Sequence, residues 1–431
     1  MNILNDIWAV LLLIGVMILI HELGHYMAAR FFDVRVHSFS FGFGPRLFGW
    51  RSGETDFRVS LIMFGGYVRM AGEQPTDEPD PRGFLSKPRW QRLIIAFAGP
   101  AMNIALAVAL LTGLFMARYP KPSFLSQPAA IGHVVPDTPA AQAGIKEGDV
   151  IVQLGDQRDP NWEDVLLKER IDAGQPMNLL IRRDQHVMPV QVTPKLDEKY
   201  GIGVAGWAEQ SDILIGSVAA GKDAARQGLQ SGDQFVSING VAINSIYKVH
   251  EITRASNGQP LNVVYLRTGQ RRSVTVQPYW SEDDKRWMMG IILAQKMDYI
   301  KLPLGSAFRE SLKQNYKGAG LILTLVRNIA ERRMSAKSLE GPIGIAQRAG
   351  EAAREGTMPF VDLMAAVSLN LAIFNLFPIP ILDGGVILLL LIEIVLRRDL
   401  SMNVKETVFK LGFVFLMMLV VFVLYNDIAK L

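Results

Sequence analysis

Four stretches of the chain carry almost no charge over lengths that approach the roughly 20 apolar residues needed for a membrane-spanning helix. They run from Ile7 to Ile20 and on into HELGHYMAARFF, from Leu93 to Ala117, from about Phe360 to Leu396 and from about Val408 to Tyr425. The third stretch is interrupted by FPIPILDGG. No basic residue precedes the first stretch and no small-residue cleavage site follows it, so we expect a retained helix and not a signal peptide. The pattern predicts a multi-pass α-helical membrane protein with four transmembrane helices.

Lys and Arg are distributed unevenly around these stretches. Ten basic residues lie from position 30 to position 92, and three more lie from 397 to 407. Because basic residues concentrate in cytoplasmic loops, both segments are predicted to be cytoplasmic. Both termini and the long segment between the second and third stretches should then lie on the outer side.

The long segment contains a duplication. Residues 131–194 align without a gap to residues 215–278 at a constant offset of 84, with 19 identical positions out of 64. The matches include Gly144 with Gly228 and Asp149 with Asp233. Each copy predicts a strand, a short helix stopped by Gly, a Gly-Asp turn, a second strand and a later hairpin. An internal repeat of this kind indicates two copies of one small α/β domain.

The amino-acid composition excludes several classes of function. The 45 Lys and Arg residues exceed the 41 Asp and Glu residues by only four, and no long basic run is present. This balance argues against nucleic acid as a partner. The chain has no cysteine, which excludes disulfides, cysteine-based zinc fingers and thiol catalysis.

The first stretch ends in a pattern that predicts metal chemistry, His21-Glu22-Leu23-Gly24-His25. On a helix, His21 and His25 lie four residues apart on one face, where two imidazoles can bind one Zn²⁺ ion. Glu22 lies beside them and can accept a proton from water. Ionisable residues inside a membrane-spanning helix are costly and indicate function, so we favour a catalytic zinc site over a polar packing cluster.

A catalytic zinc site needs a third protein ligand. His133, His186 and His250 lie in the repeat, His37 follows too closely after the first stretch, and Glu54 lies in a polar loop. Asp383 is the better candidate, because it follows two prolines that break the third stretch, and irregular backbone at membrane depth is tolerated where it lines a protein cavity. By itself this segment could also be a kinked packing helix, but the presence of HELGH favours the ligand interpretation.

The repeats and the motifs resemble known families. PAAQAGIKEGDVI and DAARQGLQSGDQFVSING resemble PDZ domains, whose peptide-facing loops would correspond to 200–204 and 288–294. Either copy could instead be steric bulk without a ligand. HELGH, the segment from Asn375 to Gly384 (NxxPxPxLDG), the GPxxN element in 97–103 and Gly-Pro-Ile at 341–343 resemble the site-2 protease family of intramembrane zinc metalloproteases, over nearly the whole chain. Val386 stands where relatives often carry His.

The resemblance implies Zn²⁺ held by His21, His25 and Asp383, with Glu22 as general base. It further implies a bacterial inner-membrane protein that cleaves transmembrane protein substrates in the lipid bilayer, such as a trimmed anti-sigma factor or remnant signal peptides. Its PDZ domains would contact peptide C-termini or substrate ectodomains and filter substrates by size. Residues implied to contact substrate are Asn375, Pro378, Pro380, Gly65, Gly66 and Tyr67.

Two further segments complete the predicted organisation. Residues 57–70 are strand-like on both sides of Gly65-Gly66, which predicts a cytoplasmic-side β-hairpin turning at these glycines. Residues 304–357 show helical periodicity with many charges, which predicts amphipathic helices on the outer membrane face, or else a solvated coil. The predicted parts are transmembrane helices 1 and 2 (1–118), PDZ domains (127–207 and 208–295), an amphipathic segment (300–358) and transmembrane helices 3 and 4 (359–431).

Two other functions are compatible with parts of this pattern. A non-catalytic membrane scaffold would use the PDZ pair alone, and the loss of Glu22 or a ligand would favour it. A metal transporter is disfavoured, because one HExxH with a buried base is a hydrolytic arrangement.

Overall fold

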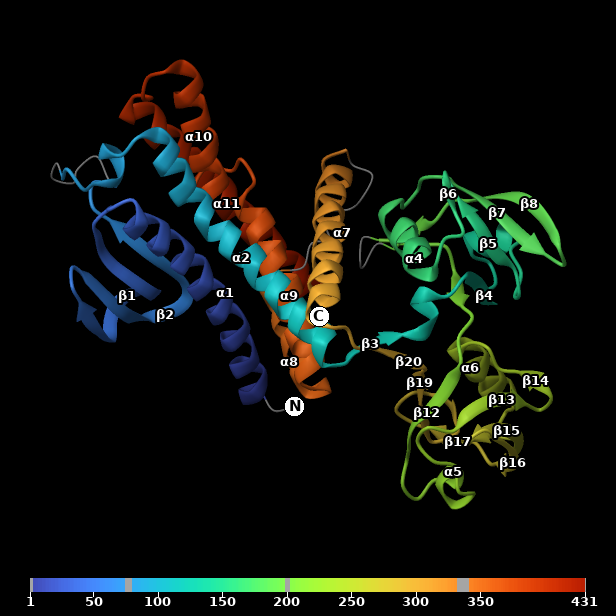
Figure 1. The fold of residues 1–431 in the computed structure, drawn as a ribbon. Coiled ribbons are helices and arrows are strands. Elements are labelled where there is room, and N and C mark those ends of the chain that lie inside the picture. Colours follow the sequence, from blue (N-terminus) through green and yellow to red (C-terminus); the bar gives the residue numbers. More distant parts are fainter. Residues whose placement is uncertain (1–2, 74–79, 198–201, 332–340, 431) are drawn as a thin grey trace. The chain divides into compact units, whose positions relative to one another are not determined.

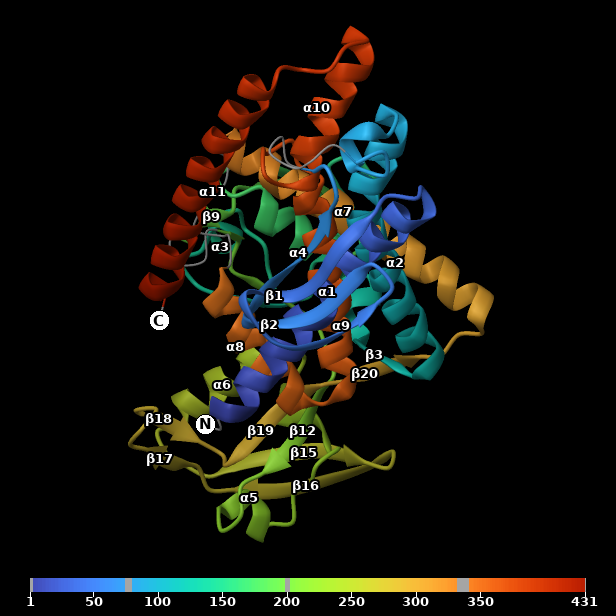
Figure 2. The same ribbon diagram turned by 90° about the vertical axis from the view of Figure 1, so that its left-hand side faces the viewer.

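The computed structural model describes residues 3–73, 80–197, 202–331 and 341–430, and Figures 1 and 2 show its ribbon. The chain forms two compact units. The helical unit comprises Met1–Tyr119, Lys301–Val326 and Leu339–Leu431, and the tandem unit comprises Pro120–Ile300 and Arg327–Ser338.

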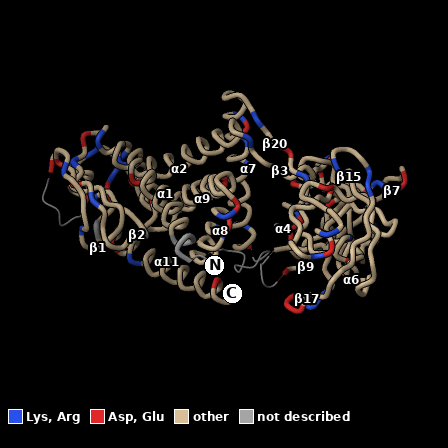
Figure 3. The backbone as a smooth tube through the Cα atoms, turned by 90° about the horizontal axis from the view of Figure 1, so that it is seen from below, with Lys and Arg blue, Asp and Glu red and all other residues tan. Residues whose placement is uncertain are grey.

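The helical unit contains the predicted apolar spans. Among the described residues, four helices are long and apolar enough to cross a membrane, within α1 (Ile3–Phe31), α2 (Arg89–Ala117), α9 (Thr357–Asn375) and α11 (Met402–Lys430). The third apolar stretch is broken as expected, since α9 ends at Asn375 and α10 (Asp383–Leu396) begins after a seven-residue irregular segment. The remaining helices of this unit are η1 (Phe84–Ser86), most of α7 (Leu304–Ala330) and α8 (Pro342–Glu355). Figure 3 shows few charged positions along α2 and α11.

The helices pack through small and apolar side chains. Leu13 and Met17 of α1 are fully buried in a cluster with Ala349 of α8 and Met364 of α9. Within the described part of 304–357 the predicted helices are present as α7 and α8, and residues 332–340 of this range lie outside the described residues. One face of α7 packs on α2 and α9, and the Ser311 hydroxyl donates to the main-chain oxygen of Val108 in α2 at 2.8 Å.

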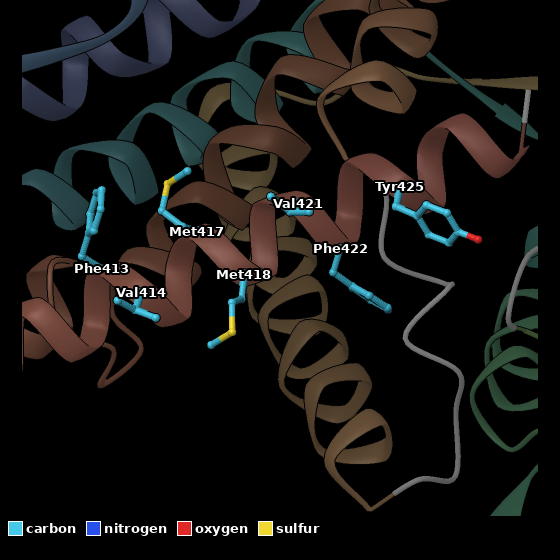
Figure 4. Close-up of a pocket in the computed structure, with 7 residues that line it drawn as sticks. All are labelled: Phe413, Val414, Met417, Met418, Val421, Phe422 and Tyr425. Carbon is cyan, nitrogen blue, oxygen red and sulfur yellow. The ribbon is translucent and has the colours of Figure 1, made fainter.

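Helix α11 is the least buried of these four helices, with 6% of its most apolar window buried. Polar or close contacts attach it to the unit near its start, in its middle and near its end. Near its start, Lys405 Nζ lies 2.6 Å from a carboxylate oxygen of Glu393, and near its end the Asp427 carboxylate accepts from the backbone N–H groups of Gly341 and Ile343 at the start of α8. Between them, Gly412 lies against Pro380. The side chains of α11 that line a shallow depression on this helix lie between positions 413 and 425, as Figure 4 shows. They are largely apolar and suit contact with lipid tails.

A sheet of two long strands, β1 (Val36–Ser52) and β2 (Thr55–Met70), packs beside α1. Residues 38–41 of β1 pair with 56–59 of β2 on one side and with 66–69 of β2 on the other. The predicted hairpin of 57–70 is therefore wrong in its pairing. The two halves of this segment do not pair with each other, because β1 lies between them, and Gly65 and Gly66 are part of β2.

Small side chains make this arrangement possible. Ser40 and Ser60 are fully buried, and their hydroxyls are 2.9 Å apart across the sheet. The segment 66–70 is left as an edge, paired with β1 on one side only.

The tandem unit confirms the duplication. The sheet of the first copy has the order β11-β4-β5-β7-β8, and that of the second has the order β19-β12-β13-β15-β16. At the offset of 84, these orders are the same. Arg183 donates through Nε to Asp149 at 2.7 Å, and the equivalent Arg267 donates in the same way to Asp233 at 2.7 Å.

The elements of the first copy are β4 (Ala129–Val134), α3 (Pro139–Gln142), β5 (Val150–Leu154), β6 (Gln157–Arg158), α4 (Trp162–Ile171), β7 (Met177–Arg183), β8 (His186–Val192), β9 (Lys195–Leu196), β10 (Gly203–Val204) and β11 (Trp207–Glu209).

The second copy follows directly. Its elements are β12 (Ile213–Val218), α5 (Asp223–Arg226), β13 (Gln234–Ile238), β14 (Val241–Ala242), α6 (Ile246–Ala255), β15 (Leu261–Arg267), β16 (Gln270–Val276), β17 (Tyr279–Ser281), β18 (Arg286–Met288) and β19 (Ile291–Gln295). The copies touch where His133 stacks on Tyr247, and Lys248 Nζ lies 3.4 Å from Glu147. The chain enters the tandem at β3 (Tyr119–Pro122) and η2 (Ser123–Ser126) and leaves at β20 (Met297–Ile300), and β3 and β20 pair with each other.

Candidate active site

Three predicted residues converge inside the helical unit. His21 Nε2 and His25 Nε2 are 3.3 Å apart, and the Asp383 carboxylate oxygens lie 3.1 Å from the first and 3.4 Å from the second. Both imidazoles are buried, and Asp383 Oδ2 is buried without a hydrogen-bond partner among the described residues. Residues more than 350 positions apart in the chain thus meet through the helix α1 and the start of α10.

The second nitrogen of each imidazole faces an oxygen acceptor or an amide. His25 Nδ1 donates to the main-chain oxygen of Ile95 in α2 at 2.8 Å. His21 Nδ1 lies 3.4 Å from the side-chain amide of Asn103, whose Oδ1 is buried and otherwise without a partner in the described chain. With the amide turned so that Oδ1 faces the ring, Asn103 accepts from Nδ1–H. In both residues Nε2 is then free to bind a metal.

Glycines allow the backbones to come this close. A Cβ atom on Gly99 of α2 would lie 2.2 Å from His25 Nε2, and one on Gly24 of α1 would lie 2.3 Å from the Ala98 oxygen. A Cβ on Gly384 would lie 2.2 Å from the Phe377 oxygen. The glycines of HELGH, of the GPxxN element and of LDGG are therefore needed for close packing around the three side chains.

The irregular segment between α9 and α10 carries Asp383 to this point. Ile381 has a φ of 88°, a strained conformation for a β-branched residue and one that clusters at functional sites. Asn375, at the end of α9, places its amide 3.5 Å from His21 Nε2. Pro378 and Pro380, expected to contact substrate, are not among the described residues that line the cavity beside the site. Pro378 is exposed, and Pro380 packs against Gly412 of α11.

A cavity of about 1290 Å³ opens beside the three side chains. Glu22 lines it, as do the predicted residues Gly65, Gly66 and Tyr67 from the edge segment of β2. The backbone N–H of Val68 faces the Glu22 carboxylate, and the N–H of Met70 donates to Glu73 at 3.1 Å. Two alternate N–H groups of the edge therefore point toward the cavity, whereas the N–H of Ala71 donates back toward β1, to the Arg35 oxygen.

A group of charged residues lies at another part of the cavity and was missed in the sequence. Glu393 is fully buried in α10, with Lys405 Nζ at 2.6 Å and Arg92 Nη2 of α2 at 3.8 Å. Arg92 also lies 3.0 Å from Asp399. The signal was present, because Glu393 is a single acid within the apolar run ILLLLIEIVL, and such residues are rarely accidental. The group joins α2, α10 and the start of α11.

The three side chains fit a zinc ion. Ligand atoms about 2.0–2.2 Å from a tetrahedral zinc are roughly 3.3 Å from one another, close to the observed separations of 3.1–3.4 Å. The unpartnered carboxylate oxygen and the two free Nε2 atoms supply the donors that such an ion requires. A second group of possible ligands, His133 with Glu147 and Glu251, already has Lys248 between its carboxylates.

Comparisons with known proteins agree with this geometry. The family model described as "Peptidase family M50" matches residues 9–419. Curated relatives include the "Regulator of sigma E protease" of Haemophilus influenzae, 28% identical, and the "Regulator of sigma-E protease RseP" of Salmonella typhimurium, 29% identical, each with 100% of both chains covered. A "Putative zinc metalloprotease" of Vibrio cholerae is 28% identical over 100% of both chains. The chain therefore belongs to peptidase family M50 and is a zinc metalloprotease.

Proposed function

We propose that this metalloprotease cleaves transmembrane segments within the membrane, using a zinc ion held by His21, His25 and Asp383. The observation that carries the proposal is the meeting of these three side chains among helices long and apolar enough to cross a membrane. A hydrolytic site built into such helices suits a substrate that is itself embedded in lipid. The alternative of a non-catalytic scaffold has no supporting observation, because Glu22 and all three donors are present.

The residues around the ion have distinct tasks in this proposal. His21, His25 and Asp383 would hold a zinc ion, which when bound would supply a Lewis acid to polarise the scissile carbonyl and to lower the pKa of bound water. Glu22 takes a proton from the attacking water and passes it to the nitrogen of the leaving amine. Asn375, with its amide near His21 Nε2, would donate to the carbonyl oxygen as negative charge develops there.

The edge segment 66–70 would hold the substrate. A helical substrate must be unwound before water can attack, and the freed backbone groups cost several kcal/mol each in lipid unless they find partners. Addition of the substrate as a strand to the β2 edge supplies them. The N–H groups of Val68 and Met70, which face Glu22 and Glu73, would then bond to substrate carbonyls.

The topology follows from the basic residues at 30–92 and 397–407, which favour a cytoplasmic position for these loops. Both termini and the tandem unit would lie on the periplasmic side of a bacterial inner membrane. Two relatives are named "Regulator of sigma E protease" and "Regulator of sigma-E protease RseP". For this chain we infer substrates that belong to such regulation, namely single-pass proteins such as an anti-sigma factor already trimmed outside. Remnant signal peptides are a second substrate class. The tandem unit would act as a filter that turns away substrates with large outer domains.

The test compares three variants in purified protein. Glu22→Gln should retain zinc and lose cleavage of a model transmembrane peptide, since the donors are unchanged while the base is gone. His21→Ala and Asp383→Ala should lose both metal and activity. Full cleavage by Glu22→Gln, or full zinc content in Asp383→Ala, would contradict the assigned roles.

A further inference from the structure

One face of α10 lines the cavity beside the proposed zinc site. Asp383, Val386, Leu390 and Glu393 all belong to this lining, and their spacing of three and four residues places them on one side of a helix. The ten residues from Asp383 to Glu393 span about 15 Å of helix, and the middle of this face is apolar. The chain then enters the loop 397–407. The cavity therefore extends from the proposed metal ligands toward the end of α10 that is expected to be cytoplasmic.

Glu393, at the far end of this face, is fully buried and only half satisfied. Its Oε1 accepts from the backbone N–H of Leu400 at 2.9 Å and lies 2.6 Å from Lys405 Nζ. Its Oε2 has no hydrogen-bond partner in the described chain, and Arg92 Nη2 lies 3.8 Å from it. A buried carboxylate oxygen without a donor is costly, so this part of the cavity wall has an acceptor that a ligand could satisfy.

Two more acids line the same cavity, Glu73 after β2 and Glu406 near the start of α11. Glu73 accepts from the backbone N–H of Met70 at 3.1 Å, which is the N–H that would bond to a substrate carbonyl. Once the substrate takes this N–H, the Glu73 carboxylate loses that donor. Glu406 pairs with Lys410 at 2.7 Å, but both side chains are more than half exposed, and such a pair exchanges partners at little cost.

The charges at this end of the cavity favour a cation over an anion. Apart from the residues around the proposed zinc site, the charged side chains described in the lining are three acids and two bases, namely Glu73, Glu393, Glu406, Arg92 and Lys405. Both bases already contact acids, since Lys405 lies beside Glu393 and Arg92 lies 3.0 Å from Asp399. One further positive charge would balance the lining, whereas a further acid would add to the excess.

We propose that Glu73, Glu393 and Glu406 form a subsite for one Lys or Arg of the substrate, and that this residue fixes which peptide bond is cut. The inference rests on the proposed function and deepens it. Single-pass membrane proteins carry Lys and Arg at the cytoplasmic end of their spans. An extended chain advances about 3.3 Å per residue, so 15 Å of cavity corresponds to about four or five residues between the cleaved bond and the basic residue. The apolar middle of the α10 face would accept the residues in between.

The first experiment compares three model transmembrane peptides cleaved by the full chain in detergent. After the cleaved bond has been mapped, the residue five positions toward the cytoplasmic end is made Lys, Leu or Glu. We expect kcat/KM to be about tenfold higher for the Lys peptide than for the Leu peptide, the effect of one charge-assisted hydrogen bond, and lowest for the Glu peptide. Equal values for Lys and Leu would overturn the proposal. If none of the three is cleaved, it is the proteolytic assignment that fails.

The second experiment moves the basic residue along a transmembrane segment of uniform apolar sequence. Mass spectrometry of the products identifies the cleaved bond. Moving the Lys by two positions should move the cleaved bond by two positions in the same direction, because the distance from the subsite to the proposed metal ligands is fixed. A cleaved bond that stays in place would contradict the assigned spacing.

Substitutions then test which acids read the charge. Glu73→Lys should reverse the preference, so that the Glu peptide is cleaved faster than the Lys peptide, and Glu406→Gln should lower the ratio of Lys to Leu cleavage. Glu355→Gln is the matched control, because Glu355 is exposed on α8 and is not among the described residues of the lining, and its ratio should equal that of the wild type. Glu393 is left intact, since removal of a buried charge destabilises the fold.

The ratio of two peptides on one variant is independent of any general loss of activity. The same order of affinities should appear when the three peptides bind to the Glu22→Gln variant, which does not cut them. An unchanged ratio in both Glu73→Lys and Glu406→Gln would show that these acids do not read the substrate.

Discussion

At the residue scale, each imidazole of the proposed zinc site is oriented by a contact on its far nitrogen. For His25 that contact is the Ile95 main-chain oxygen, which no side-chain substitution removes. For His21 it is the Asn103 side chain, which can be replaced. Asn103 is fully buried inside α2, and its main-chain oxygen accepts from the Ser368 hydroxyl of α9 at 2.9 Å. The residue therefore links α2 to both the proposed metal site and the third span.

We predict that Asn103→Leu lowers zinc affinity by about 10–100-fold, the usual effect of removing an outer hydrogen-bond partner of a metal-bound histidine. Asn103→Asp is the matched variant, because its carboxylate still accepts from Nδ1–H. Competition with a chelator measures the affinity, and thermal unfolding without metal shows whether the fold is intact. Equal affinities in Asn103→Leu and the wild type would show that Asn103 only fills space.

The side chains of the proposed zinc site could be selected from the sequence as candidates, because each is an ionisable group inside an apolar stretch. HELGH and Asp383 are of this kind, and the structure brings them together. Val68 could not be predicted in this way, because its contribution is a backbone N–H and its side chain carries no signal. The role of Pro378 and Pro380 could not be predicted either. The sequence pattern does not show whether these prolines line the cavity or only interrupt the helix between α9 and α10.

At the element scale, the free edge of β2 is the part of the fold that the sequence predicted least well. Alternation in 57–70 indicated strands on both sides of two glycines, but the partner strand lies in 36–52, where glycines and serines weaken the pattern. The pairing of β1 with both halves of β2 depends on buried hydroxyls such as Ser40 and Ser60. Register of this kind is set by contacts between distant residues and not by local propensity.

If substrate pairs with the free edge of β2, proline substitutions at successive positions of this strand should alternate in their effect on cleavage. Val68→Pro should slow cleavage by about tenfold with zinc retained, since it deletes one N–H that faces the cavity, worth about 1–1.5 kcal/mol. Val68→Ala keeps the N–H and should stay close to wild type. Tyr67→Pro removes an N–H on the β1 side of the strand and should lower the unfolding temperature instead. The test measures the cleavage rate, zinc content and unfolding temperature of all three variants. Equal cleavage rates in Val68→Pro and Val68→Ala would mean that the substrate is held elsewhere.

At the scale of the whole molecule, the duplication was the most reliable prediction, because a constant offset across 64 residues tests many positions at once. The strand orders of the two copies match at that offset. The repeat by itself could not show how the contacts of the two copies differ. Glu169 of the first copy accepts from the backbone N–H of Ala205, whereas the equivalent Thr253 donates its hydroxyl to the Val249 oxygen of its own helix. The packing of α7 on α2 and α9 was also beyond the sequence, because an amphipathic face fits a helix neighbour as well as a membrane surface.

The tandem unit is inserted into the chain at one place. Strands β3 and β20 pair with each other, and the N–H of Ser123 donates to the Lys296 oxygen at 2.9 Å. The chain therefore enters and leaves at adjacent points, which is the arrangement that tolerates removal of an inserted domain. All of the proposed catalytic side chains belong to the helical unit.

Deletion of residues 127–295, closed by a short Gly-Ser linker, should accordingly leave a folded protein that binds zinc and cleaves a trimmed substrate at a rate within a few fold of wild type. It should also cleave an untrimmed substrate, which the intact protein rejects if the tandem unit filters by size. The matched control is the same deletion with Glu22→Gln, which should cut neither substrate. Rates on both substrates are measured together with zinc content. A deletion variant that binds zinc and cuts the trimmed form, yet still rejects the untrimmed one, would place the filter in the helical unit, where the cavity beside Glu22 would then have to exclude the larger substrate.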